Sequence, residues 1–392
     1  MSLGWKSLDF LIKYHKFCYK AFEYLQPFFK KDRIIIFESF SPYSDLINVS
    51  SFVEYLSKNK IKHKFVYNYR NKSFKKTKTT INCESRMDFI KSAFWDLLKA
   101  HTVVTSVGLG EEHDYLFQKN KFINYIYIDH GVCLLKSFKF MGFEPERFNY
   151  IKVVNSYEQE MILNETEFKQ EQIINAGLPR FDKLKKIDTR QKSIFLMFTW
   201  RKSLNNENFL DSLYFKKFSE LLKNEKFNEL IKKNNIKLKI ALHPCMNILE
   251  KAKEIFSSFE NSKFENIETS NISKNIAKCN LLITDYSSLF FDFAYLNTPV
   301  IFYRFDSDVK DEIYLEKESI KYAMTKDKYL YKCVYDINSM LSLVEKYIEN
   351  SFQLEEKNMK KNDKLFEYIE RGKCCENLYK IIMKLKEKNN AK

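Results

Sequence analysis

Short apolar runs separated by longer amphipathic stretches recur along the chain. In the first half these runs are rich in β-branched and aromatic residues and alternate with stretches of helical spacing. They cover residues 33–37, 64–67, 103–105, 124–128, 151–154 and 173–175. Strands that are apolar throughout and alternate with helices are typical of a parallel sheet covered on both faces. The pattern therefore predicts an α/β fold.

A charged stretch at residues 183–192 interrupts this alternation, which then restarts. The second series of apolar runs covers residues 193–199, 237–242, 281–284 and 299–303. The chain has 392 residues, which is more than one hydrophobic core usually serves. We therefore predict two doubly wound, Rossmann-like domains at residues 31–185 and 193–335, joined by a linker.

Both ends of the chain have helical patterns. Over residues 5–29, apolar residues at helical spacing alternate with lysines, which predicts an amphipathic basic helix within residues 1–30. Two interpretations of this helix remain open, docking on the first domain and lying on an anionic membrane surface. Residues 336–392 are helical in pattern and rich in Lys and Glu. These helices either close the second domain or cross back to the first.

The composition predicts folding throughout and anionic partners. Apolar residues make up 45% of the chain and aromatic residues 16%, unlike disordered chains. Lys and Arg outnumber Asp and Glu by 66 to 51, and the formal charge of +15 favours phosphates, nucleic acid or membrane surfaces. Eight scattered cysteines without a CxxC pair or cleavable signal indicate reduced thiols, and no apolar run approaches a membrane span. We expect a cytoplasmic protein, with a peripheral position on the inner face of the membrane as the alternative.

Two kinds of ligand site are disfavoured by the sequence. With only seven glycines the chain has no GxGxxG and no P-loop, which argues against a nicotinamide or P-loop nucleotide enzyme. Asp306, Ser307 and Asp308 form a DxD triplet of the kind that holds a metal in some transferases, but Asp311 and Glu312 follow closely. We interpret this segment as a solvated acidic loop and predict no metal site.

Open parallel sheets bind ligands beyond the carboxyl ends of their strands, so polar residues directly after apolar runs are the candidates for chemistry. In the first half, Asp129, His130 and Gly131 follow the run that ends at Ile128. Glycine permits a sharp turn, and Asp129 is placed to orient the imidazole, as a general base requires. A histidine with a purely structural role is the alternative interpretation.

Two further candidates follow apolar runs in the second half. His243 comes directly after the run at residues 237–242, so two of the six histidines close strands in opposite halves. Thr199, Trp200 and Arg201 end another run and offer a hydroxyl, a stacking surface and a cation.

A turn closes the first half and carries an arginine. Gly177 and Pro179 precede Arg180, and Asp182 follows it. A rigid turn would hold the guanidinium of Arg180 toward a cleft, where it matches phosphate oxygens bidentately. An interdomain salt bridge is the alternative interpretation.

The last candidate is the segment from Thr284 through Asp285 to Ser287 and Ser288, with Asp292 four residues later. A strand ends and a helix begins in this segment. The two serines would present hydroxyls and backbone N–H groups to a phosphate, helped by the helix dipole. An ordinary helix cap is the alternative interpretation.

In this order, the motifs resemble the CDP-glycerol:poly(glycerol phosphate) glycerophosphotransferase family of teichoic-acid and capsule polymerases, over residues 33–303. The resemblance includes an early segment made of Phe37, Glu38, Ser39 and Phe40 and then Tyr43, Ser44 and Asp45. It implies a GT-B fold, two Rossmann-like domains facing a cleft. It also implies transfer of glycerol phosphate from CDP-glycerol to a polysaccharide or lipid-linked acceptor, with release of CMP and without a tightly bound cofactor or essential divalent metal.

By motif match, the resemblance makes His130 and His243 the two catalytic histidines. It implies donor contacts for Arg180, Thr199, Ser287, Ser288 and Asp292. We also predict donor-binding roles for Asp129, Gly131, Trp200 and Arg201, and supporting roles for Asp285, Lys136 and Asp182. The chain departs from the family where Val132 to Leu135 replace the usual Thr-Pro-Leu, so that Lys136 comes one residue late. Phe198 and Leu242 also differ from the family's usual residues. These departures concern acceptor specificity and the cytidine or polyol end of the donor.

Two alternatives remain beside this function. One keeps the fold but uses CDP-ribitol or a nucleotide sugar. The other is a non-catalytic basic protein that binds a membrane or nucleic acid. The aromatic residues fall mostly in apolar periodic runs, which is typical of a core and not of stacking platforms, so we expect no nucleic-acid partner.

Overall fold

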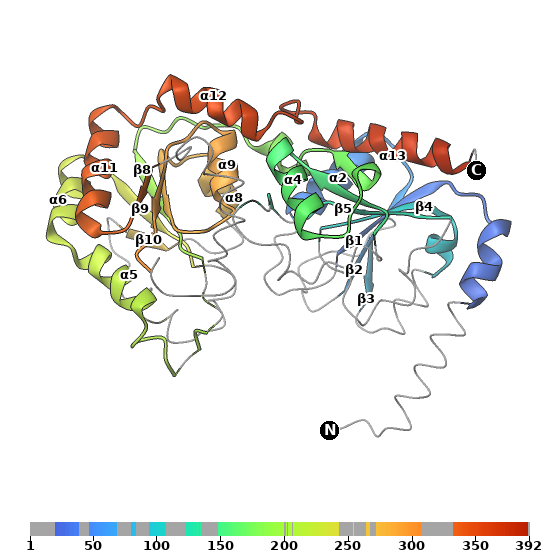
Figure 1. Ribbon diagram of the computed structural model, residues 1–392, viewed down its shortest axis with the longest axis horizontal. Coiled ribbons are helices and arrows are strands. Elements are labelled where there is room, and N and C mark those ends of the chain that lie inside the picture. The colour runs from blue at the N-terminus through green and yellow to red at the C-terminus, as the bar shows by residue number, and fades with distance from the viewer. Residues whose placement is uncertain are drawn as a thin grey trace.

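The computed structural model consists of two parallel β-sheets that lie side by side along its long axis (Figure 1). It describes residues 20–38, 47–68, 80–83, 94–106, 122–129, 131, 132, 134, 148–199, 201, 203–205, 207–242, 254, 264–266, 272–306 and 332–390. The first sheet precedes the charged stretch at residues 183–192, and the second sheet follows it. The predicted α/β class with two doubly wound sheets is confirmed.

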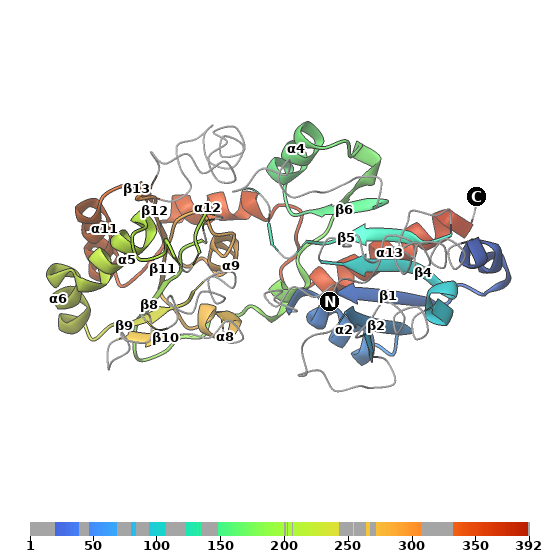
Figure 2. The ribbon, with the colours of Figure 1, turned by 90° about the horizontal axis from the view of Figure 1, so that it is seen from below.

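The first sheet has seven parallel strands in the order β3-β2-β1-β4-β5-β6-β7, and Figure 2 shows β6, β5, β4, β1 and β2 in sequence. The strands are β1 (Arg33–Glu38), β2 (His63–Asn68), β3 (Thr80–Cys83), β4 (Ala100–Thr105), β5 (Asn124–Tyr127), β6 (Tyr150–Val153) and β7 (Ile173–Asn175). The helices of this half are η1 (Gln26–Phe28), α2 (Ile47–Lys58), α4 (Ser156–Glu165), η4 (Gln170–Gln172) and η5 (Pro179–Lys183). The strand order reverses between β1 and β4, where such sheets bind ligands.

The second sheet has six parallel strands in the order β10-β9-β8-β11-β12-β13, which repeats the topology of the first. The strands are β8 (Ser193–Leu196), β9 (Lys237–Ile240), β10 (Phe264–Asn266), β11 (Leu281–Thr284), β12 (Val300–Tyr303) and β13 (Lys332–Val334). The helices are α5 (Leu213–Lys223), α6 (Glu225–Lys233), α8 (Ile272–Ile276), α9 (Phe290–Tyr295) and α11 (Ile337–Glu349). Here the reversal lies between β8 and β11.

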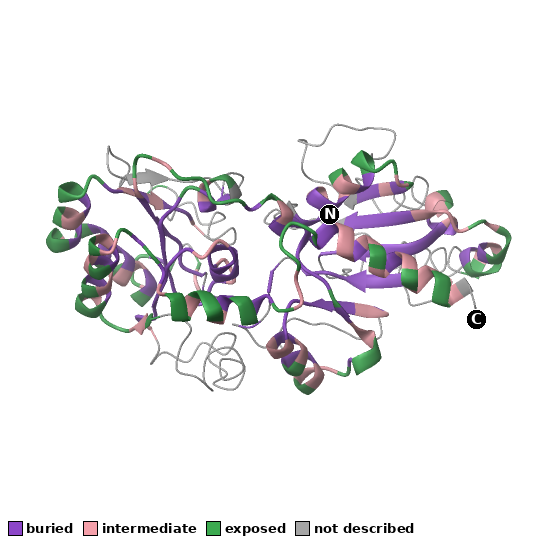
Figure 3. Ribbon diagram, turned by 90° about the horizontal axis from the view of Figure 1, so that it is seen from above, coloured by how far each residue is buried: buried purple, intermediate pink, exposed green. Residues whose placement is uncertain are grey.

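The sequence explains why these elements form. Every residue of β8, β11 and β12 is buried, as expected for strands covered on both faces, and Figure 3 shows the strands of both sheets as mostly buried. Helix α6 begins where the side chain of Asn224 accepts a hydrogen bond from the backbone N–H of Phe227. It buries Phe227 and Ile231, four residues apart on one face, and each such side chain contributes roughly 1.5–3 kcal/mol.

The C-terminal helices reach both sheets (Figure 1). Helix α11 buries Met340 and Val344 in the core of the second sheet. After α12 (Glu356–Leu365), helix α13 (Cys374–Asn390) buries Leu378 and Ile382 against the first sheet. The C-terminal segment therefore packs on the second sheet through α11 and on the first sheet through α13.

The N-terminal helix predicted from the sequence falls mostly outside the described residues, of which 20–25 are helical. Phe22 is fully buried in the first core, and its ring lies 5.8 Å from that of Phe94 in an edge-on arrangement. This end of the predicted helix therefore docks on the first half. Among the described helices, none has the length and apolarity that crossing a membrane requires.

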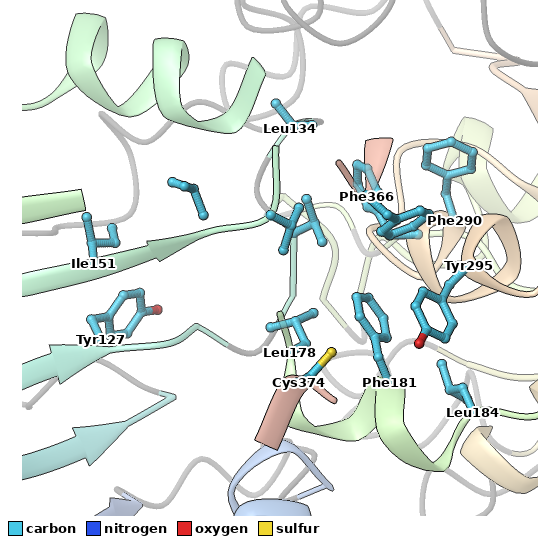
Figure 4. Close-up of a cluster of buried hydrophobic side chains, with 14 of the residues drawn as sticks. Tyr127, Leu134, Ile151, Leu178, Phe181, Leu184, Phe290, Tyr295, Phe366 and Cys374 are labelled. Carbon is cyan, nitrogen blue, oxygen red and sulfur yellow. The ribbon is translucent and has the colours of Figure 1, made fainter. Parts of the chain in front are cut away.

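Aromatic side chains join the two halves (Figure 4). The ring of Phe181 in η5 stacks on that of Tyr295 in α9, with centroids 4.5 Å apart, and both rings meet Phe366 edge-on. Such pairs add about 0.5–1.5 kcal/mol each beyond the area they bury. The three residues belong to one continuous core cluster that contains side chains from both sheets, so the two halves share a hydrophobic core.

Candidate functional site

The chain turns sharply just after strand β5. Asp129 lies in the left-handed region with a φ of 56° and is almost fully buried. This conformation costs a residue with a side chain about 1–2 kcal/mol, although Asp and Asn tolerate it best. The backbone carbonyl of Asp129 accepts a hydrogen bond of 3.1 Å from the Asn48 side chain at the start of α2. The left-handed conformation thus lies at Asp129 and not at Gly131, where the sequence led us to expect it, and the segment is held from a neighbouring element.

Gly131 brings this turn against the second half of the molecule. A Cβ atom added to Gly131 would lie 3.1 Å from Oγ of Ser288, which is closer than side chains normally pack. Only glycine allows the two segments to approach so closely without displacement. The strand-end segments of the two sheets, which the sequence singled out separately, thus meet at one place.

In the second half, Asp285 ties together the segments that follow β8 and β11. Its carboxylate accepts hydrogen bonds from the backbone N–H groups of Thr199 (2.8 Å) and Tyr286 (2.6 Å). It also accepts from the guanidinium of Arg201 at 2.8 Å. Arg201 in turn donates to the Asp306 carboxylate at 2.7 Å and to the Thr199 carbonyl at 2.6 Å. We call Thr199, Arg201, Asp285 and Asp306 the carboxylate brace.

The charges of the carboxylate brace are buried. Asp285 has no exposed surface and Arg201 is 6% exposed. Burial by itself lowers the pKa of Arg201, but the charges of Asp285 and Asp306 outweigh it and raise that pKa above its ordinary value. Burial also raises the pKa of the Tyr286 hydroxyl, whose ring lies under the guanidinium of Arg201 at 5.3 Å. Arg201 therefore stays charged and braces the loops.

Thr199 contributes a hydroxyl group to the carboxylate brace. Its Oγ1 is buried and has no hydrogen-bond partner within the described part of the chain. Most buried polar atoms in folded proteins have a partner, which can be a ligand or water. Thr199 is therefore the described residue of the brace best suited to receive a ligand oxygen.

Ser287 and Ser288 precede α9, which begins at Phe290 and has six residues. The helix thus begins slightly later than the sequence indicated. Oγ of Ser287 accepts a bond of 3.3 Å from the backbone N–H of Leu289, while Ser288 is half-buried and faces Gly131. Ser288 is consequently the serine of this pair that faces the first half.

Arg180 and Asp292 form a bidentate ion pair between the two halves. The guanidinium Nε and Nη2 atoms donate to the two carboxylate oxygens at 2.7 and 2.8 Å, and both side chains are almost fully buried. This is the interdomain salt bridge that the sequence left as the alternative interpretation of Arg180. The donor-binding roles of both residues stay predictions.

Asp182 has a different environment, because its carboxylate oxygens accept from the backbone N–H groups of Cys374 (2.7 Å) and Cys375 (2.8 Å) and so cap α13.

Four predicted site residues, His130, His243, Trp200 and Lys136, lie outside the described residues, as do Ser307 and Asp308 of the DxD triplet. The predicted convergence of the two histidines therefore stays a prediction. Asp306, the first residue of the triplet, binds Arg201 in the carboxylate brace. In the described ranges, no group of three His, Cys, Asp or Glu side chains is arranged to hold a metal ion.

Sequence reasoning missed three residues that contact these segments. Lys152 on β6 donates a hydrogen bond of 3.0 Å to the Gly131 carbonyl and forms a buried ion pair with Glu158. Asn48 bonds the Asp129 carbonyl. The sequence held one signal for the first pair, since Lys152 interrupts an apolar strand run just before Asn155 and Glu158, whose spacing is typical of a helix start.

Comparison with known proteins identifies a family over most of the chain. The family described as CDP-Glycerol:Poly(glycerophosphate) glycerophosphotransferase matches residues 18–384. The minor teichoic acid biosynthesis protein GgaB of Bacillus subtilis (strain 168) is 27% identical over 291 residues, which are 68% of this chain and 30% of that protein. The teichoic acid poly(glycerol phosphate) polymerase of Bacillus spizizenii is 24% identical over 310 residues, 70% of this chain and 74% of that protein. The chain thus spans less than half of GgaB.

Solved structures show the same fold. The wall teichoic acid polymerase TagF superposes with a TM-score of 0.69 at 18% identity, covering 97% of this chain and 96% of that one. The UDP-GlcNAc 2-epimerase from Methanocaldococcus jannaschii gives a TM-score of 0.56 at 16% identity, over 90% of this chain and 99% of that one. These likenesses and the two sheets confirm the GT-B architecture. Because the family match covers nearly its full length, this chain belongs to the CDP-glycerol:poly(glycerophosphate) glycerophosphotransferase family.

Proposed function

We propose that this chain transfers glycerol phosphate from CDP-glycerol to a hydroxyl group of a cell-surface polymer and releases CMP. The observation that carries the proposal is the approach of Gly131 to Ser288. It joins the turn that bears His130 to a serine next to the carboxylate brace, in a chain of this family. A base on one sheet and phosphate contacts on the other then face a common substrate.

In the proposed reaction, the acceptor hydroxyl attacks the phosphorus that bears glycerol, and the bond from that phosphorus to CMP breaks. His130 takes the proton of the hydroxyl, while His243, Arg180 and the two serines stabilise charge on the phosphates. Asp292 already holds the guanidinium of Arg180 in one orientation. A cation fixed in this way loses little side-chain freedom when it meets a phosphate, and positioning of this kind carries much of the catalysis of phosphoryl transfer.

The donor and the acceptor are tested by one assay. CMP release by the purified chain is measured with CDP-glycerol, CDP-ribitol and UDP-hexoses, each with and without polyol-phosphate or lipid-linked acceptors. We expect CMP release with CDP-glycerol and an acceptor, at a rate well above that with the other donors. Faster turnover with CDP-ribitol or a nucleotide sugar would assign the alternative donor. Binding of nucleic acid that weakens with salt, without any CMP release, would support the non-catalytic alternative instead.

We also propose contact with an anionic membrane surface near the N-terminal end. Tyr24 and Phe28 are each 73% exposed, with ring centroids 5.9 Å apart, and Trp95 is 57% exposed beside Phe29. Exposed aromatic side chains close to lysines, such as Lys30, are typical of interfacial segments. Cosedimentation with phosphatidylglycerol vesicles should weaken when Tyr24 and Phe28 are changed to Ser. Equal binding to phosphatidylcholine vesicles would argue against an electrostatic contact.

A further inference from the structure

A fully buried ion pair lies under the turn after β5. Lys152 on β6 and Glu158 in the first turn of α4 are each 1% exposed, and Nζ of Lys152 lies 3.1 Å from Oε1 of Glu158. Burying two charges costs several kcal/mol per ion, and apolar residues of similar volume often give equal or greater stability. Stability alone therefore does not account for a lysine between Ile151 and Val153 in a buried strand.

Glu158 is fixed at the junction of strand and helix. Its second carboxylate oxygen accepts a hydrogen bond of 2.8 Å from the backbone N–H of Val154. Its own backbone N–H donates to the side chain of Asn155, the cap of α4, at 2.8 Å. The carboxylate is thus an anchored point, and the ammonium group of Lys152 is held in place by it.

From this anchored position, Lys152 reaches the turn that contains His130. Its Nζ donates a hydrogen bond of 3.0 Å to the backbone carbonyl of Gly131. On the other side of the histidine, Nδ2 of Asn48 donates 3.1 Å to the backbone carbonyl of Asp129, and Asn48 is 1% exposed. The carbonyl groups of both neighbours of His130 are therefore held by buried donors from two different elements.

We propose that Lys152 and Asn48 are positioning residues that hold the backbone of Gly131 and Asp129, the sequence neighbours of His130, with Gly131 against Ser288 of the second half. Neither residue is assigned to touch a substrate. A buried charge-assisted bond suits this task because it is stronger than a neutral one and geometrically fixed by Glu158. The effect on turnover that we expect rests on the proposed function. The effect on the backbone of Asp129 and Gly131 does not.

The test removes the donor to Gly131 without leaving a buried charge. In the double variant Lys152→Met with Glu158→Gln, the volumes stay similar, and the glutamine oxygen still accepts from the N–H of Val154. The single variant Lys152→Met is avoided because it would leave Glu158 charged and buried without its partner. The matched control makes the same two changes in the exposed pair of Lys380 and Glu376 on α13.

Two readouts separate positioning from a merely structural role. The first is kcat for CMP release together with the Kd of CDP-glycerol, and we expect kcat to fall by about tenfold or more at an unchanged Kd. The second needs no substrate. It is the rate at which diethyl pyrocarbonate modifies His130, followed by peptide mass spectrometry and compared with the rate in the control variant. We expect this rate to change by about threefold or more, since imidazole reactivity follows exposure and protonation.

The outcomes decide the proposal as follows. A folded double variant with lower kcat and altered His130 modification supports it, provided that the control variant behaves like wild type. Unchanged His130 modification in the folded double variant overturns it, whatever happens to turnover. If the wild-type chain releases no CMP from CDP-glycerol, the proposed function fails, and the modification rate alone decides the positioning. If the double variant does not fold, Asn48→Ala decides by the same readouts.

Discussion

The two strand-end regions that meet at Gly131 and Ser288 are built in different ways. In the first half, the turn after β5 is held through its backbone carbonyls by Asn48 and Lys152. In the second half, the carboxylate brace ties the loops together through buried charges, with Asp285 at its centre. In the first region, the charge of Lys152 is paired with Glu158, which does not belong to the turn, and only backbone carbonyls of the turn are bound. In the second region, the charged side chains of the loops themselves bind one another. We therefore expect changes in the first region to affect turnover, and changes in the second to affect stability and donor binding together.

The largest effect on turnover is expected at His130. We expect His130→Ala to lower kcat for CMP release by about 10²- to 10⁴-fold, the usual contribution of a general base. The Kd of CDP-glycerol, measured by calorimetry, should stay near the wild-type value because most of the donor contacts predicted from the sequence belong to the other half. His63→Gln at the amino end of β2 is the control and should keep wild-type turnover. Unchanged kcat in His130→Ala would remove this histidine from the mechanism.

A change in the carboxylate brace should have the opposite signature. Asp285→Asn leaves the buried Arg201 with less opposing charge, and breaking a buried pair typically costs about 3–5 kcal/mol of unfolding free energy. We expect urea unfolding at lower denaturant and a higher Kd for CDP-glycerol. Asp306→Asn removes only the outer contact of Arg201 and should have a smaller effect. Equal stability of Asp285→Asn and wild type would show that the brace does not organise these loops.

The contact between the halves can be disturbed with a single methyl group. In Gly131→Ala, the new Cβ would lie 3.1 Å from Oγ of Ser288 and must displace the turn or the serine. We expect kcat to fall by about tenfold, as for a small misplacement of reacting groups, with little change in unfolding free energy. Gly177→Ala is the matched comparison, since its Cβ would overlap Sγ of Cys374 away from the turn. That variant should lose stability and keep kcat while folded.

The smallest effect at neutral pH is expected at His101, a buried histidine on β4 of the first sheet. Burial lowers the pKa of His101 to about 4, whereas the pKa of a histidine in an unfolded chain is about 6.5. The unfolded state therefore binds more protons between these values, so stability is fully present above pH 6.5 and is lost as the pH falls toward 4. We expect His101→Gln to flatten this loss in urea unfolding at pH 7, 6 and 5, without changing turnover at pH 7. An unchanged slope would mean that other groups carry the acid sensitivity.

Much of the fold follows from local pattern. Runs such as Leu281 to Ile283 are apolar throughout because helices cover both faces of the sheets, and the charged stretch between the two series falls between the two sheets. The positions of the polar motifs were predictable for the same reason, since polar residues directly after such runs must lie at a sheet edge. Asp285 and Asp129 are examples.

The partners of these residues were not predictable, because pairing across the molecule leaves no local pattern. Asp292 lies 112 positions from Arg180, yet this pair links the two halves of the molecule. Lys152 lies 21 positions from Gly131, yet this pair holds the turn after β5. Asp182 was expected to support the donor site, and its two bonds to α13 depend on a helix that returns from the far end of the chain. In each of these cases, a buried polar group finds its hydrogen-bond partner in a residue that is distant in the sequence.

In the proposed mechanism, His130 and His243, which follow strand runs in opposite halves of the sequence, act on one substrate. The decisive measurement is the rate of CMP release from CDP-glycerol, with acceptor present, by wild type, His130→Ala, His243→Ala and the double variant. Groups that act as a unit are strongly non-additive, so we expect each single variant to be slow and the double variant to be hardly slower. CMP release at the wild-type rate by both single variants would contradict the claim.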